Sequence, residues 1–123
     1  MTRIMVGIVI AAVAVTLAYV FEAPNSLGAH PFWDQQVLVI GAGIGAILGL
    51  ISLPLPNVAR IGGFLALTVL AYLAASWGKE TFAASYAEDA FAGRIWYFGW
   101  FATVAAATAF LFSLATPKKA LPR

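Results

Sequence analysis

The chain has 123 residues, of which 63% are hydrophobic and only 10% are charged. A soluble domain of this size carries about a quarter charged residues and has too much surface to hide this much apolar area inside itself. The composition therefore argues against an ordinary soluble domain and predicts that a bilayer surrounds most of the chain. The lack of cysteine excludes disulfides, thiolate metal sites, iron–sulfur clusters and haem attached through cysteine.

The charged residues form islands that separate four uncharged apolar stretches. The acidic residues are Glu22, Asp34, Glu80, Glu88 and Asp89, all in two of the breaks. The basic residues at the start, in the middle turn and in the tail are Arg3, Arg60, Lys118, Lys119 and Arg123, against Lys79 and Arg94 in the acidic breaks. Because lysine and arginine favour the cytoplasmic side, this pattern predicts that both termini are cytoplasmic. The dispersed basic residues do not indicate a nucleic-acid partner.

The first apolar stretch covers residues 4–21. A bilayer core of ~30 Å needs about 20 apolar residues, so this stretch is just long enough to span it. Arg3 and the small residues Thr16 and Ala18 also fit a cleavable signal peptide. The apolar run continues past Ala18, however, which favours an uncleaved span.

The second and third apolar stretches cover residues 36–53 and 61–77. The break before them, residues 22–35, contains several turn formers and ends in Phe32 and Trp33, which suit a headgroup boundary. The turn between them contains two prolines and is short, so these two spans are expected to form a tight antiparallel hairpin.

The polar stretch 78–94 is compatible with a short interfacial helix or an ordinary loop. The fourth apolar stretch, 95–114, opens with a dense group of aromatic residues and is followed by Pro117. The whole chain, 1–123, is therefore expected to be one all-α integral membrane domain. It would have four transmembrane helices in a compact bundle, with both termini inside. The composition is compatible with a bacterial inner-membrane protein.

The glycines of the second span form the sharpest local pattern. Residues 37–46 match a GxGxxA dinucleotide fingerprint, but that motif needs a soluble parallel sheet and an acid about 20 residues later, where the chain has Arg60. Gly41, Gly45 and Gly49 instead recur every four residues and predict a close helix-packing face; a backbone-lined cavity is the less favoured alternative. Ala102 and Ala106 predict a similar face on the last span. The sequence leaves open whether the partner helix belongs to the same chain.

Four polar residues predicted to lie on the outer side are the remaining candidates for a site. His30 is the only histidine, and a metal or haem site usually needs more ligands, so it is expected in a turn, paired with Asp34 if the loop is helical there. Glu88 and Asp89 could share a cation or a proton but are expected to be a solvated loop end. No catalytic or metal-binding set is recognisable.

No charged residue or histidine lies at the centre of a predicted span, which disfavours a coupled transporter. The leading hypothesis is a non-catalytic accessory subunit of a larger respiratory, photosynthetic or transport complex, docked through its small-residue faces. Its expected partners are membrane lipids and other subunits or further copies, with no intrinsic cofactor and with a lipid or quinone-like molecule in grooves between chains. The alternatives are an oligomeric passive channel or small-solute transporter component, and a less favoured enzyme using His30, Asp34 or Glu88.

Overall fold

The computed structural model describes residues 2–117, and all regular structure in that range is helical. The helices are α1 (Thr2–Val20), α2 (Ala23–Leu27), α3 (Asp34–Ile51), α4 (Asn57–Ala84) and α5 (Ala90–Ala115). All except α2 are long and apolar enough to cross a membrane. The prediction of an all-helical chain with four candidate spans is thus confirmed, and it is consistent with a multi-pass membrane protein.

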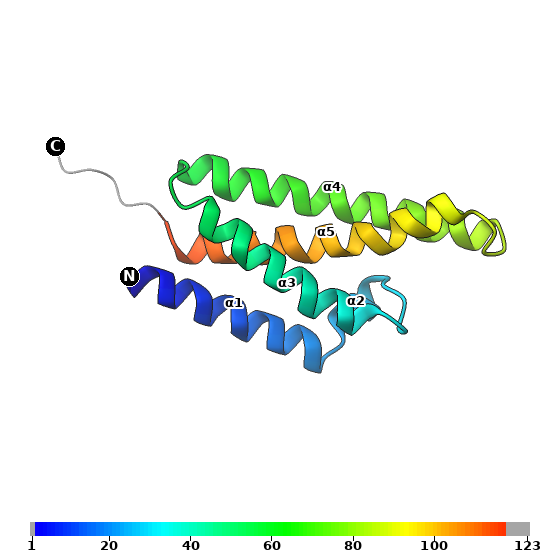
Figure 1. The fold of residues 1–123 in the computed structure, drawn as a ribbon, viewed down its shortest axis with the longest axis horizontal. Coiled ribbons are helices and arrows are strands. Elements are labelled where there is room, and N and C mark those ends of the chain that lie inside the picture. Colours follow the sequence, from blue (N-terminus) through cyan, green and yellow to red (C-terminus); the bar gives the residue numbers. More distant parts are fainter. Residues whose placement is uncertain (1, 118–123) are drawn as a thin grey trace.

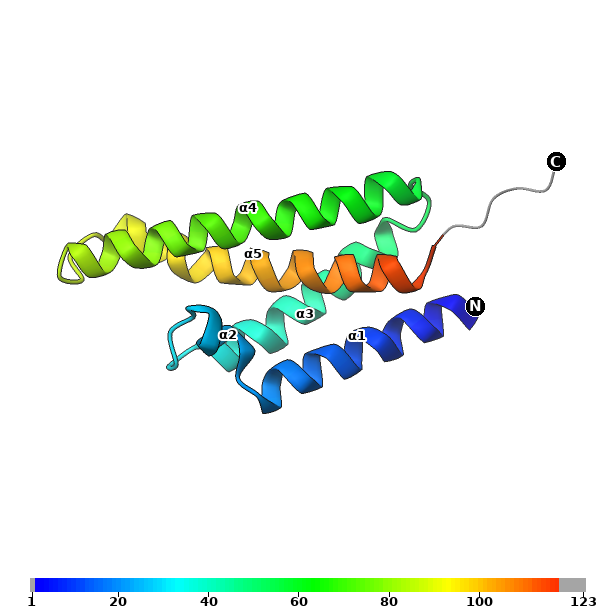
Figure 2. The same ribbon diagram turned by 180° about the vertical axis from the view of Figure 1, so that it is seen from behind.

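Helix α5 is the centre of the arrangement, because α1, α3 and α4 all pack against it (Figures 1 and 2). Helices α3 and α4 are antiparallel, but they do not pack tightly along each other as the sequence suggested. Small residues of α5 let both helices approach α5 instead: Gly99 lies against Ala75 of α4, and the backbone at Ala105 lies against Gly45 of α3. The short turn fixes the direction of the two helices without making them direct partners.

The start of α1, the α3–α4 turn and the end of α5 lie at one end of the bundle (Figure 1). A guanidinium nitrogen of Arg3, Nη1, donates a hydrogen bond of 2.8 Å to the carbonyl oxygen of Pro117 and joins the two ends of the described chain. The basic residues predicted for the tail, Lys118, Lys119 and Arg123, lie outside the described residues. We call this end of the bundle, where Arg3 lies, the basic end.

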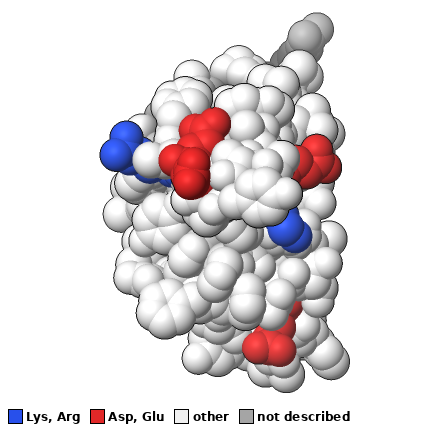
Figure 3. Space-filling view, turned by 90° about the vertical axis from the view of Figure 1, so that its right-hand side faces the viewer, with Lys and Arg blue, Asp and Glu red and all other residues white. Residues whose placement is uncertain are grey.

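The opposite end carries α2 and the α4–α5 turn (Figure 1), and acidic side chains gather on its surface (Figure 3). All five carboxylates of the chain are at this end, together with Lys79 and Arg94. We call it the acidic end.

The stretch 78–94 is neither a loop nor a separate interfacial helix. Helix α4 continues to Ala84 and α5 starts at Ala90, so both helices extend beyond the predicted apolar ranges 61–77 and 95–114. Gly78, the first residue of this stretch, is a site of close approach: a Cβ there would lie 2.5 Å from the backbone nitrogen of Trp96. Its lack of a side chain lets the ends of α4 and α5 pack together.

A compact turn joins α4 to α5. The backbone N–H of Tyr86 donates to the Ala83 carbonyl at 3.1 Å, and that of Ala87 donates to the Phe82 carbonyl at 3.0 Å. This pair of bonds is the Schellman arrangement that commonly ends a helix, usually with glycine in the left-handed position. Here Tyr86 and Ala87 have φ values of 56° and 65°, so no glycine in the sequence marked the turn.

The remaining boundaries also shift. Helices α1 and α3 match the predicted ranges 4–21 and 36–53 within two residues at each end. The break at 22–35 contains the short helix α2, which the sequence did not predict.

Helices α4 and α5 are longer than a bilayer core requires. Their 28 and 26 residues correspond to about 42 and 39 Å. Helix α1, with 19 residues, and α3, with 18, correspond to about 28 and 27 Å, close to the ~30 Å core. The tip of the α4–α5 hairpin therefore extends beyond α2 at the acidic end (Figure 1).

Candidate functional site

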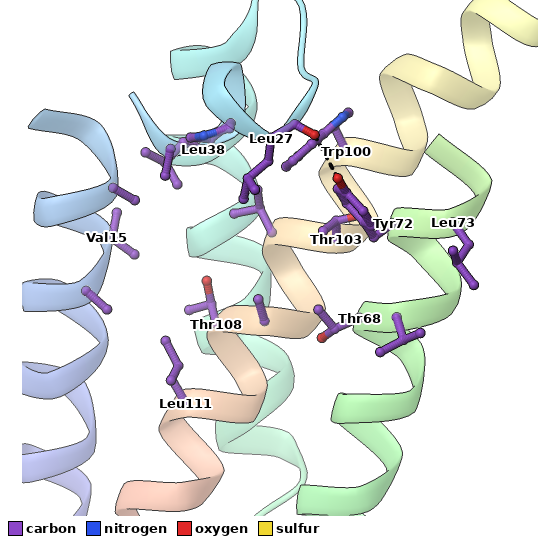
Figure 4. A pocket seen from close by; sticks show the side chains of 17 residues that line it. Val15, Leu27, Leu38, Thr68, Tyr72, Leu73, Trp100, Thr103, Thr108 and Leu111 are labelled. Atoms are coloured by element: carbon purple, nitrogen blue, oxygen red, sulfur yellow. Dashed lines mark hydrogen bonds between the residues drawn. The ribbon is translucent and has the colours of Figure 1, made fainter. Parts of the chain in front are cut away.

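An apolar groove of about 490 Å³ runs along α5, with α1 and α4 as its walls (Figure 4). Ala14 and Ala18 line it from α1, and Leu73 lines it from α4. Its floor on α5 runs from Trp100 to Leu111. We call it the α1–α4 groove.

Helix α2 closes the groove toward the acidic end. Pro24 and Leu27 of α2 line the groove there. The Tyr72 hydroxyl of α4 donates a 2.9 Å hydrogen bond to the Leu27 carbonyl, drawn as a dashed line in Figure 4. The Trp96 indole N–H of α5 donates one of 3.0 Å to the Gly28 carbonyl. The α2 segment is thus held in place by side chains from two long helices.

The lining of the groove offers little for binding polar solutes. Two of the three threonine hydroxyls in the lining, those of Thr68 and Thr103, point back into their own helices, where each donates a 2.7 Å hydrogen bond to a carbonyl one turn earlier. Such back-bonding satisfies a hydroxyl without any ligand. The groove therefore suits a hydrocarbon better than water, an ion or a sugar.

Ala102 and Ala106 line a different hollow, of about 620 Å³, which lies over α5 between α3 and α4. Ala106 is buried, whereas Ala102 is exposed. Ile44 of α3 and Phe64 of α4 form opposite sides of this hollow. The two alanines predicted as a packing face therefore lie where α3 and α4 separate.

The glycine face of α3 lies against α5 of the same chain. A Cβ at Gly41 would lie 2.9 Å from the Val104 Cβ, and one at Gly49 would lie 2.7 Å from a ring carbon of Phe112. A Cβ at Gly45 would overlap the carbonyl oxygen of Ala105. The partner helix that the sequence left open is thus internal, and this face is not free for another protein.

A buried arginine at the basic end is the main feature that sequence reasoning missed. Arg60 is only 1% exposed and lies in the first turns of α4. Its Nη1 donates to the Thr116 carbonyl at 2.6 Å, its Nη2 to the Thr116 hydroxyl at 2.7 Å, and its Nε to the Ser52 hydroxyl at a longer 3.4 Å. Ser52 and Thr116 are the C-terminal caps of α3 and α5.

The position of Arg60 has an electrostatic reason. The last carbonyls of a helix lack partners within the helix and carry partial negative charge, which a cation stabilises. The Arg60 guanidinium donates hydrogen bonds to groups at the ends of α3 and α5. Arg3 donates one to the next carbonyl, that of Pro117. Arg60 is thus a clamp that joins the start of α4 to the ends of α3 and α5.

His30 takes part in an aromatic cluster at the acidic end. Its ring stacks on Trp33, with centroids 6.0 Å apart, and meets Trp96 edge-on at 5.5 Å. Its Nδ1 accepts a 3.0 Å hydrogen bond from the Phe32 backbone N–H. These contacts connect the loop before α3 to α5.

Asp34 does not pair with His30, and the condition for that pairing is not met, because residues 30–33 are a turn and not a helix. It lies in the first turn of α3 and is 2% exposed, and its Oδ2 has no hydrogen-bond partner among the described residues. The neighbouring Gln35 donates through Nε2 to the Tyr19 carbonyl at 2.9 Å, but its Oε1 is also buried without a partner. Two hydrogen-bond acceptors at the acidic end are therefore unsatisfied.

Glu88 and Asp89 do not act as a carboxylate pair in the structure. Asp89 is the N-terminal cap of α5, and its Oδ1 accepts a 3.0 Å hydrogen bond from the Ala92 backbone N–H. Its own N–H donates to the Ser85 hydroxyl at 2.9 Å. Glu88 is exposed. The cap explains why α5 starts before the predicted aromatic group.

Comparisons of the chain with family models, with curated proteins and with solved structures found no match. Within residues 2–117, no cluster of three or more histidine or acidic side chains could hold a metal ion.

Replacing Asp89 by alanine should lower the free energy of unfolding by about 1 kcal/mol, the usual cost of losing an N-terminal cap. Glu88→Gln is the control, because that side chain is exposed and should have almost no effect. Both values are measured by denaturant unfolding in detergent. Equal loss in the two variants would show that the cap does not stabilise α5.

Proposed function

We propose that the protein is a membrane-embedded, non-catalytic accessory subunit of a larger membrane complex. The observation that supports this most is the contrast between its polar and apolar groups. The charged side chains of Arg3, Arg60 and Asp89 bind backbone groups at helix ends and so stabilise the fold. Meanwhile α1 and α4 present long apolar faces that nothing in the described chain covers. We therefore expect the protein to act by contacting other subunits through these apolar faces.

The proposed orientation places the basic end in the cytoplasm and the acidic end outside, in a bacterial inner membrane. The placement of Arg3 and Arg60 at one end and of all the carboxylates at the other supports it. The protruding α4–α5 tip would then stand outside the membrane, where soluble parts of partner subunits could reach it.

A passive channel is less well supported. A channel would need a path lined by free polar groups, but the Thr68 and Thr103 hydroxyls are bonded within their own helices. The α1–α4 groove is apolar and closed by α2 at one end. Its geometry gives water no continuous polar route.

The outer face of α4 is the best candidate for contact with a partner subunit. A Cβ added at Gly62 or Gly63 would meet nothing within 4 Å, so these glycines are not needed for packing inside the chain. Small residues on a membrane helix let a neighbouring helix approach closely. Unlike Gly41, Gly45 and Gly49 of α3, Gly62 and Gly63 of α4 remain free to contact another chain.

Gly63→Leu is therefore expected to remove partner subunits from the purified complex while leaving the protein itself folded. Leucine favours a helix by up to about 1 kcal/mol over glycine, so stability should not fall. The measurement is co-purification of partners from the native membrane, together with the thermal midpoint of the purified chain. Gly43→Leu is the matched control, because Gly43 on α3 is equally open.

If Gly63→Leu keeps every partner in unchanged stoichiometry, the α4 face is not the interface. If Gly43→Leu also loses partners, the contact involves α3 as well and is not specific to α4.

A further inference from the structure

The α1–α4 groove has the size of one hydrocarbon chain lying in one leaflet. From Trp100 to Leu111 its floor is roughly 16 Å long, at a rise of about 1.5 Å per residue. This is about half of the ~30 Å hydrocarbon core. Its volume of about 490 Å³ is within the range of about 300–1,000 Å³ typical of small-molecule sites.

The closed end of the groove argues against a transmembrane helix as the occupant. A spanning helix is about 30 Å long and about 10 Å wide, so in the groove it would collide with Pro24 and Leu27 of α2. Moving α2 aside would break the hydrogen bonds from Tyr72 and Trp96. A single flexible chain can lie against Pro24 and Leu27 without breaking either bond.

The charges around the closed end of the α1–α4 groove favour one type of lipid headgroup over another. All the carboxylates lie at this end, with only Lys79 and Arg94 to balance them, so an anionic headgroup would be repelled. Asp34 and Gln35 each have a buried oxygen without a donor. Asp34 does not itself line the groove, but it lies one helical turn before Leu38, which does, so the two residues are on the same face of α3. An ammonium group supplies both the charge and the N–H donors that these oxygens lack.

We propose that the α1–α4 groove binds one acyl chain of a zwitterionic phospholipid whose ammonium group lies at the acidic end, close to Asp34. This inference depends on the proposed membrane location but not on the proposed role as an accessory subunit. It also gives the second half of α1 a packing partner. Gly7 and Ala11 are the buried residues of α1, neither lies beyond the middle of the helix, and the lipid chain fills the space beside the half that follows.

The test is native mass spectrometry of the full chain with an equal mixture of two phospholipids that share the same acyl chains. One has an ethanolamine headgroup, and the other has an anionic glycerol headgroup. Wild-type protein is expected to retain one ethanolamine lipid in preference to the anionic lipid. Ala107→Phe, which fills the groove, should lose this lipid, whereas Ala102→Phe, in the hollow between α3 and α4, should keep it. Asp34→Asn should remove the preference between headgroups.

A second measurement avoids the risk that a variant misfolds. An ethanolamine lipid with a photoactivatable group halfway along its chain is added to wild-type protein, and the adducts are mapped by peptide sequencing. Adducts should concentrate on groove residues such as Leu73, Ala107 and Leu111.

Three results would overturn the proposal: equal retention of the anionic lipid by wild-type protein, retention by Ala107→Phe, or adducts spread over all exposed apolar faces. A partner polypeptide cross-linked at Leu73 and Ala107 would identify a protein as the occupant and would also overturn it. Lipid masses and polypeptide masses are read separately, so failure of the lipid site leaves the test of the accessory role unaffected.

Discussion

Replacing Arg60 by alanine is expected to lower the free energy of unfolding by about 3–5 kcal/mol. The substitution removes two short charged hydrogen bonds to Thr116 and leaves the carbonyl of a helix end buried without a donor. It also empties the space of the largest fully buried side chain in the described chain. The loss is measured by denaturant unfolding in detergent micelles.

Two controls separate the sources of this loss. Arg60→Met keeps most of the packing but none of the hydrogen bonds, so about 2 kcal/mol should still be lost if the bonds matter. Arg94→Ala removes an exposed arginine at the acidic end and should change stability by about 0.5 kcal/mol or less. A value for Arg60→Ala as small as that for Arg94→Ala would show that the clamp does not hold the helix ends together.

Gly45→Leu is expected to cost about 3 kcal/mol or to prevent folding, because the side chain would enter the space that the α5 backbone occupies. A Cβ alone would overlap the Ala105 carbonyl oxygen and lie 2.7 Å from the Thr108 Cβ. These are backbone and β-branched neighbours, which cannot turn away, so α3 would have to move off α5. Unfolding in detergent, together with the resistance of the chain to proteolysis, measures the effect.

Gly43→Ala is the matched control on the same helix. A Cβ at Gly43 meets nothing within 4 Å, so alanine should raise stability by up to about 1 kcal/mol through its higher helix propensity. Gly45→Leu with wild-type stability would mean that α3 and α5 do not pack in this register. A loss at Gly43 as large as that at Gly45 would mean the same.

The number and order of the long helices could be predicted from the sequence, since uncharged stretches of sufficient length alternate with charged breaks. The ends of the helices could not. Gly78 directly follows the predicted range 61–77, yet its role depends on the backbone of Trp96, a contact between distant residues that no local pattern shows. The α4–α5 turn uses Tyr86 and Ala87 in left-handed conformations, so the usual glycine signal was missing.

The candidate site was also only partly predictable. The spacing of Gly41, Gly45 and Gly49 marked a packing face but could not identify its partner, because any helix with small residues fits such a face. Arg60 lies close to a turn in the sequence, a position that is typical of an exposed charge. Its burial depends on two helix ends that meet only in the folded chain. The α1–α4 groove combines residues from five helices, and no single segment carries its signature.

The role as an accessory subunit is tested most directly by native mass spectrometry of the tagged protein, extracted from its own membrane in mild detergent. We expect a particle that contains other polypeptides in fixed stoichiometry with this chain, and their identities would name the process that it serves. A particle that contains only this chain, as a monomer or a homo-oligomer, would contradict the proposal. Solute flux in proteoliposomes would then become the next measurement.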